Sequence, residues 1–181
     1  MNKEDIIRQF DCNGPGIQGN LFGLPFTPEN ADLIILPVPW EVTVSYHSGT
    51  ANGPQAVLNA SSQVDLAFKD IPEAWKLGIA MLPVPESLYQ ESSRLRELAL
   101  KHIHSLESGE PPSKDNPLVA KVNQGCENLH IYTRSSTLKH LEEGKMVAVL
   151  GGDHSTPLGF IRALAEKYHR FGILQIDAHA D

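Results

Sequence analysis

Two stretches that repeat one pattern decide the fold: Met146-Val147-Ala148-Val149-Leu150-Gly151-Gly152-Asp153-His154-Ser155 and Gly172-Ile173-Leu174-Gln175-Ile176-Asp177-Ala178-His179-Ala180-Asp181. Each begins with an apolar run of strand length, Met146 to Leu150 or Gly172 to Ile176, and continues into residue types that bind metals. Between them, Thr156 to Arg170 predicts a helix, because apolar residues recur at helical spacing after a capping Thr and a Pro at the first helical position. This order predicts a parallel strand–helix–strand crossover.

The two polar clusters are predicted to meet in space. Parallel strands joined by one helix end at the same edge of the sheet, where open α/β sheets bind their ligands. Side chains alternate along an extended segment, which places Asp177, His179 and Asp181 on one side. His154 approaches from the neighbouring strand end, after two glycines that allow a close backbone approach. Either motif alone is also typical of a solvated acidic turn, but two of them one crossover apart favour a metal site.

Both motifs resemble the paired signature of a known family. Gly-Gly-Asp-His-Ser followed by Asp-Ala-His-x-Asp is similar to the signature of the ureohydrolases, the arginase and agmatinase family. Upstream, Thr43-Val44-Ser45-Tyr46-His47-Ser48-Gly49-Thr50 and Gly53-Pro54 resemble a loop of bacterial agmatinases, many of which have Arg where this chain has His47. The resemblance covers most of the chain from Asp32 to Asp181, with gaps.

The resemblance implies a three-layer α/β/α fold with a mainly parallel sheet, and a centre of two Mn²⁺ ions per complete subunit. The metal ligands that it implies in this chain are His154, Asp177, His179 and Asp181. His154 and Asp181 would bind one ion, His179 the other, and Asp177 would bridge them. Asp181 is also implied as the catalytic residue that accepts a hydrogen bond from the shared hydroxide. The substrate-binding residues stay unassigned.

The family takes two further ligands from an Asp-x-Asp motif in a later strand, whereas this sequence ends at Asp181 and holds four of the six. We therefore expect the amino-terminal part of a longer enzyme or a truncated product, inactive alone in either case. Residues 1–30 are predicted to form an N-terminal arm. Residues 31–181 are predicted to be the amino-terminal part of a single ureohydrolase α/β domain, incomplete in this chain.

The reaction that the resemblance implies is hydrolysis of a guanidino compound similar to agmatine to urea and an amine. Imidazole and carboxylate ligands without thiolate suit several divalent ions, and a carboxylate-rich bridged site together with the family favours Mn²⁺. A hydroxide shared by two ions would be the nucleophile. The alternatives are arginase, guanidinobutyrase or formimidoylglutamase activity, and a non-catalytic metal-binding or interaction protein. Zinc-dependent amide hydrolysis of the histone deacetylase type is disfavoured, since the motifs match the ureohydrolase pattern.

Composition limits the partners and the location. Hydrophobic residues make up 41% and charged residues 20% of the 181 residues, which is ordinary for a globular domain. A net charge of −7 disfavours nucleic acid and weakly suits a small cationic substrate. Two cysteines, Cys12 and Cys126, are typical of reduced thiols. With neither a signal peptide nor a membrane-length apolar segment, we expect a cytoplasmic protein without membrane contact, and a homo-oligomer.

The rest of the chain predicts alternating strands and helices. The run Leu33-Ile34-Ile35-Leu36 is typical of a buried strand, which Pro37 and Pro39 would end. The loop Trp40 to Asn52 should then overhang the strand-end crevice.

Further elements follow from apolar spacing and capping residues. They are a helix over Asp5–Phe10, a helix over Gly53–Ser61 with Ala56, Val57 and Ala60 facing inward, a strand over Leu77–Val84, a helix over Glu86–Ser105 and a helix over Leu118–Glu143 ending at Gly144.

Overall fold

The fold is α/β, with a parallel sheet between helices. The computed structural model describes residues 2–44, 47–113 and 115–178. Within these residues the sheet has three parallel strands in the order β2-β1-β3. The strands are β1 (Leu33–Val38), β2 (Ile79–Met81) and β3 (Met146–Gly151). The predicted fold class, an incomplete three-layer α/β/α domain with a parallel sheet, is confirmed.

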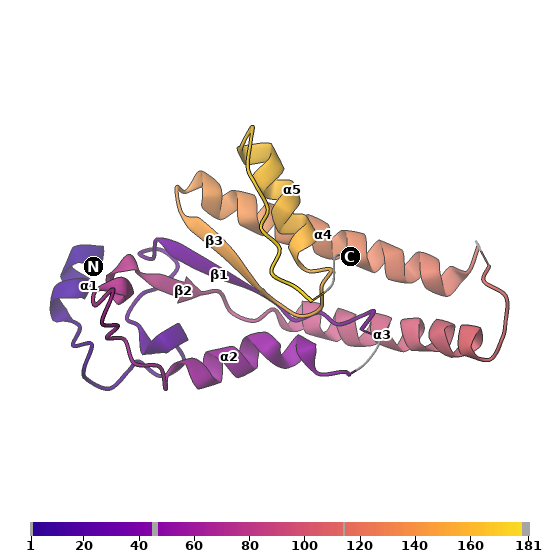
Figure 1. Ribbon diagram of the computed structural model, residues 1–181, viewed down its shortest axis with the longest axis horizontal. Coiled ribbons are helices and arrows are strands. Elements are labelled where there is room, and N and C mark those ends of the chain that lie inside the picture. Colours follow the sequence, from indigo (N-terminus) through magenta and orange to yellow (C-terminus); the bar gives the residue numbers. More distant parts are fainter. Residues whose placement is uncertain (1, 45–46, 114, 179–181) are drawn as a thin grey trace.

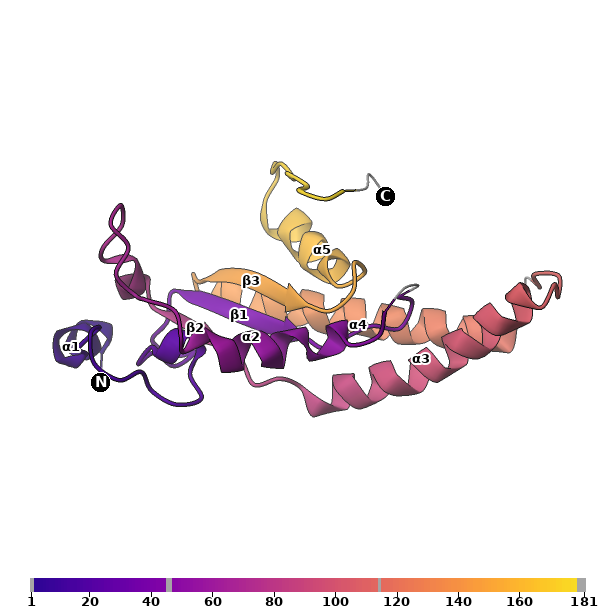
Figure 2. The ribbon, with the colours of Figure 1, turned by 60° about the horizontal axis from the view of Figure 1, so that its bottom comes forward.

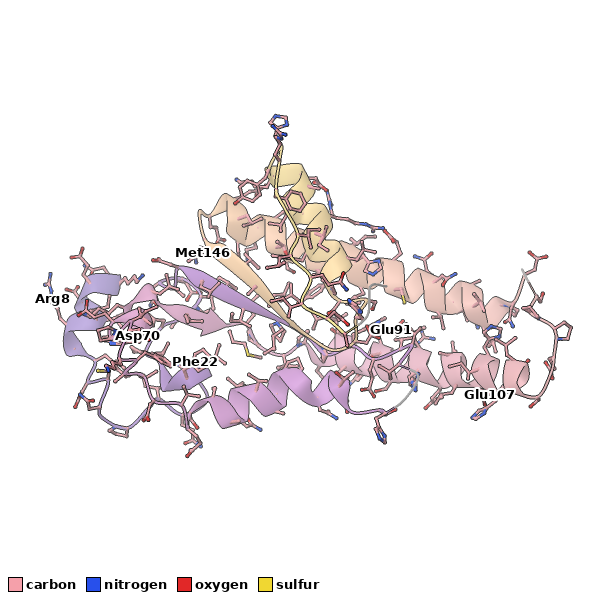
Figure 3. The ribbon with its side chains drawn as sticks, in the orientation of Figure 1. Arg8, Phe22, Asp70, Glu91, Glu107 and Met146 are labelled. Atoms are coloured by element: carbon pink, nitrogen blue, oxygen red, sulfur yellow. The ribbon has the colours of Figure 1, made fainter. Side chains whose placement is uncertain are left out.

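Helices lie on both faces of the sheet. The α-helices of the described residues are α1 (Lys3–Gln9), α2 (Gly53–Ser61), α3 (Glu86–Glu107), α4 (Pro117–Glu142) and α5 (Pro157–Lys167). Figure 2 shows α2 in front of the strands and α4 behind them. The antiparallel pair α3 and α4 continues well beyond the sheet (Figure 1), and Glu107 marks its distal end in Figure 3. No helix in this part of the chain combines the length and the apolar composition that a membrane span requires.

The central strand β1 pairs past Pro37, where the sequence predicted an end. Pro37 stands opposite Leu150 of β3. The Ile35 carbonyl accepts a hydrogen bond from the Leu82 N–H, so alternate residues of β1, including Pro37, direct their backbone groups toward β2. Because β2 ends at Met81, opposite Ile35, the missing N–H of Pro37 interrupts no bond between β1 and β3. The prediction was wrong because it ignored which neighbour the proline faces.

The core has two clusters of buried side chains. One lies between β1 and the helices α3 and α4, and consists of Leu36, Val38, Trp40, Val42, Leu95, Ala99, Val122 and Leu129. The other joins the amino-terminal residues to the opposite end of the sheet, and consists of Ile6, Leu24, Phe26, Ala31, Ile34, Trp75 and Ala80. Residues 1–30 therefore contribute apolar side chains to the folded body. Burial of this area is the main favourable term in its stability.

The helix α2 has the predicted bounds, but the predicted inward face is wrong. Ala56, Val57 and Ala60 are exposed, whereas Pro54 and Ser61 are buried. Ser61 Oγ accepts a hydrogen bond from the Phe22 backbone N–H at 2.9 Å. The helix thus turns a partly polar stripe toward the short 3₁₀ turn Leu21–Gly23, and this contact outweighs the weak apolar pattern of its sequence.

The remaining predicted helices are confirmed with small shifts at their ends, and Gly144 ends α4 with a φ of 77°. The predicted strand over Leu77–Val84 is shorter, because a 3₁₀ turn occupies Ala74–Leu77 and Gly78 takes a positive φ of 72°.

The predicted strand over Gly172–Ile176 is wrong. Residues 171–176 have no regular secondary structure, and Ile173, Leu174 and Ile176 are 65%, 87% and 92% exposed. An extended segment becomes a strand by pairing with a neighbour. Here α5 packs against α4 and leads the chain back alongside itself, so the segment lies outside the sheet in both views (Figure 1, Figure 2).

Gly159 fixes the crossing of α5 over α4. A Cβ at this position would overlap the His130 carbonyl oxygen and stand 2.9 Å from Thr133 Cβ and 3.0 Å from Arg134 N. These neighbours are mainly backbone atoms of α4, which cannot rotate away. The two helices therefore pack backbone to backbone at this point.

We expect Gly159→Ala to lower the free energy of unfolding by about 1–3 kcal/mol, because overpacking exceeds the roughly 1 kcal/mol that alanine gains as a helix former. Denaturant titration followed by circular dichroism measures this loss. The exposed Ala165→Gly in the same helix is the matched control, with an expected loss of about 1 kcal/mol from propensity alone. A Gly159→Ala variant as stable as the wild type would contradict the close crossing.

Candidate functional site

The turn at the end of β3 presents His154. Asp153 Oδ1 accepts hydrogen bonds from the Ser155 N–H at 3.0 Å and the Ser155 hydroxyl at 2.6 Å. Thr156 was predicted to cap α5, but its Oγ1 donates to the Asp153 carbonyl oxygen at 3.0 Å instead. Both side chains thus stabilise the turn, and the His154 side chain, 53% exposed, projects from it.

Gly152 allows this turn to lie against the end of β1 and the residues that follow it. A Cβ on Gly152 would overlap the Trp40 carbonyl oxygen and stand 2.8 Å from the Val38 carbonyl oxygen. In the same place the Asp153 N–H donates to the Trp40 carbonyl at 2.8 Å. The close backbone approach predicted from the sequence is therefore present, and no larger residue fits at position 152.

The loop after β1 borders the same edge, as predicted. Thr50 Oγ1 donates to the Gly152 carbonyl oxygen at 3.2 Å, and a Cβ on Gly53 would stand 3.3 Å from the Gly151 carbonyl oxygen. His47 is exposed. Ser45 and Tyr46, which carry part of the family resemblance, lie outside the described residues.

The structure brings His154 close to Asp177. Their Nδ1 and Oδ2 atoms are 3.8 Å apart, although Asp177 follows a segment that pairs with no strand among the described residues. The other two predicted ligands, His179 and Asp181, lie outside the described residues. Within residues 2–44, 47–113 and 115–178 no group of three or more His, Cys, Asp or Glu side chains is placed to hold a metal ion. Imidazole and carboxylate are the types of donor that divalent transition metals bind in proteins.

Buried polar groups lie directly behind the turn. Asp153 Oδ2 is buried and has no hydrogen-bond partner in the described part of the chain, and the buried Trp40 side chain lies beside Cys126. Burial raises the pKa of the nearby Cys126 thiol, and the negative charge of Asp153 raises it further. No role was predicted for Cys126, because no short motif links it to Asp153. The two residues come near each other through the packing of α4, which local sequence patterns do not report.

The parallel sheet and the helices on both faces define an α/β protein, and the polar turns at the strands' carboxyl ends form a candidate site at a sheet edge. Residues 31–181 match the model of the arginase family. The chain belongs to the arginase family.

Relatives in this family share about a quarter to a third of the residues. The chain is 33% identical over 162 residues to an N(1)-aminopropylagmatine ureohydrolase of Thermus thermophilus, covering 89% of this chain and 44% of that protein. A protein of the same name from Synechocystis is 29% identical over 154 residues, covering 84% and 41%. An agmatinase of Neisseria meningitidis serogroup B is 27% identical over 160 residues, covering 87% and 42%. The chain thus spans less than half the length of these relatives, and no solved structure matches it significantly.

We expect native Cys126 to react with iodoacetamide more slowly than the same thiol in the unfolded chain at pH 8, because its raised pKa keeps it protonated and the thiolate is the nucleophile. The rate should climb as the pH rises above the range of an ordinary thiol. Mass spectrometry of a Cys12→Ser variant, with and without denaturant, measures Cys126 alone. Equal rates in the folded and unfolded chain would contradict this environment.

Proposed function

We propose that the complete protein is a manganese-dependent ureohydrolase, which hydrolyses the guanidinium group of a small cationic compound to urea and an amine. One observation carries the proposal: His154 at the end of β3 and Asp177 after α5 converge to 3.8 Å at the carboxyl edge of the sheet. Both belong to the motifs that resemble the ureohydrolase signature. Family membership and the names of the relatives support the same reaction class.

His154, Asp177, His179 and Asp181 would hold the metal pair. A centre of two Mn²⁺ ions, when bound, lowers the pKa of a shared water and so supplies hydroxide near neutral pH. The residues of this chain would orient the metal ligands. The Asp153–Ser155 turn holds the backbone on both sides of His154, and Gly152 lets that turn sit against β1. Asp181 is proposed to accept a hydrogen bond from the nucleophile.

Two substrates are the main candidates. Relatives from Neisseria meningitidis are named agmatinase, whereas those from Thermus thermophilus and Synechocystis are named N(1)-aminopropylagmatine ureohydrolase. Both names describe a cationic guanidino compound, and the second carries an additional aminopropyl group. Agmatine is therefore one candidate substrate. The higher identity to the Thermus protein adds N(1)-aminopropylagmatine as the other. A cytoplasmic homo-oligomer remains our expectation for the assembly.

The full-length protein is expected to bind two Mn²⁺ ions per subunit and to release urea from agmatine, N(1)-aminopropylagmatine or both. Metal analysis and a urea assay over a panel that includes arginine, guanidinobutyrate and formiminoglutamate measure this. The 181-residue chain alone, with four of the six ligands, is expected to release none. A full-length protein with no stoichiometric metal, or with no urea from any compound, would overturn the proposal.

Replacing His154 with Ala should remove one imidazole from the metal site. We expect the rate of urea release to fall at least about 100-fold and one Mn²⁺ ion to dissociate more readily than the other, while the circular dichroism spectrum stays unchanged. His104→Ala is the matched control, because His104 lies near the distal end of α3 and is highly exposed. Full activity and full metal content in the His154 variant would remove it from the ligand set.

A further inference from the structure

Glu41, three residues after the end of β1, closes the loop that borders the site. Its Oε2 accepts hydrogen bonds from the Gly49 N–H at 2.7 Å and the Ala51 N–H at 2.9 Å. A carboxylate that accepts from two backbone donors forms stronger hydrogen bonds than a neutral acceptor does. The Glu41 side chain thus joins the start of the loop to its end at residues 49–51.

Glu41 is itself held firmly by α3. Its backbone N–H donates to the hydroxyl of Ser92, which is 1% exposed, at 2.9 Å. The next carbonyl, that of the fully buried Val42, accepts from Arg96 Nη1 at 3.2 Å. The carboxylate therefore starts from a fixed backbone position, which lowers the entropy cost of ordering the loop.

The residue between the two bound amides connects this loop to the candidate site. Thr50 stands between Gly49 and Ala51, and its hydroxyl donates to the Gly152 carbonyl at 3.2 Å. Gly152 is two residues before His154 and occupies the close contact with β1. The bonds from Glu41 to the amides on both sides of Thr50, and the bond from Thr50 to Gly152, therefore join Glu41 through the backbone of residues 49–51 to the turn that presents His154.

This arrangement requires a glycine at position 49, because the backbone there takes a conformation that other residues rarely adopt. Its φ is 125°, in the region that favours glycine, whereas a Cβ there would find no heavy atom within 4 Å. The space is free, so the constraint comes from the backbone turn that directs the Gly49 N–H toward Glu41. The surrounding residues 47–49 are exposed, and losing the carboxylate would release the loop without opening the core.

We propose that Glu41 is a positioning residue of the strand-end site. It holds the loop after β1 against the His154 turn, and thereby fixes the wall of the site that faces the guanidino substrate. This inference rests on the proposed ureohydrolase function for its kinetic consequence. Its structural part, the coupling of Glu41 to Gly49, Ala51 and the Gly152 turn, is measurable without substrate.

The test uses the full-length protein with Glu41→Ala and Glu41→Gln. In the Ala variant we expect amide hydrogen exchange at Gly49 and Ala51 to accelerate at least about tenfold, and exchange at Asp153 to accelerate with them. We expect kcat/KM for urea release to fall about 10- to 100-fold, mainly through KM, because a loosened loop contributes less binding to the substrate and the transition state alike. The Gln variant keeps a neutral acceptor and should recover part of both effects.

Two further comparisons separate positioning from general stability. Thr50→Val removes the hydroxyl at nearly constant volume and should raise KM as Glu41→Ala does, whereas Thr50→Ser should behave as the wild type. The exposed Glu97→Gln on α3 is the matched control and should change neither exchange nor kinetics. Unchanged exchange at Gly49 and Ala51 in Glu41→Ala, or unchanged kcat/KM in an enzyme that is active, would overturn the inference. A wild type that releases no urea would instead refute the proposed function, while the exchange rates would still decide the coupling.

Discussion

The close approach of the Gly151-Gly152 turn to the carboxyl end of β1 is the contact on which the candidate site depends. The Asp153 N–H bonds the Trp40 carbonyl across this contact, and a side chain on Gly152 would abolish it. Because β1 and β3 pair in register from Leu33 to Val38, both strands end together. The turn after one strand and the loop after the other must therefore share the same small volume, and polar groups at their ends become neighbours.

Elements fixed by interactions between residues close in sequence were predicted well, and those fixed by contacts between distant residues were not. The strand β3, the polar turn and the long helices were predicted because period, capping residues and apolar runs are local signals. The role of Pro37 required the identity of the neighbouring strand, and the buried face of α2 required the contact of Ser61 with Phe22. Neither contact leaves a periodic signal in the sequence. The same holds for Glu41, whose partners are set by the path of a loop rather than by spacing in a motif.

In the candidate site, too, one part of the prediction agrees with the structure and another does not. The proximity of His154 and Asp177 agrees with the edge rule, yet the strand that was expected to deliver Asp177 is absent from residues 171–176. The apolar run Gly172 to Ile176 satisfies the sequence criterion for a strand, but the criterion presumes a partner. No strand among the described residues pairs with this run, so its apolar side chains stay in water, and the position of Asp177 depends on the helix that precedes it.

That dependence places the α4–α5 crossing among the determinants of the site. Two ion pairs, Arg134 with Glu166 and Arg162 with Glu127, join these helices, and in each the arginine lowers the pKa of its glutamate. All four groups reach solvent, where such pairs contribute little, since water screens the attraction and long side chains lose freedom. The backbone contact at Gly159 tolerates far less displacement, because atoms of the α4 main chain lie where any side chain would be. The angle at which α5 crosses α4 and returns the chain to His154 is thus set by sterics at Gly159 rather than by the surface ion pairs.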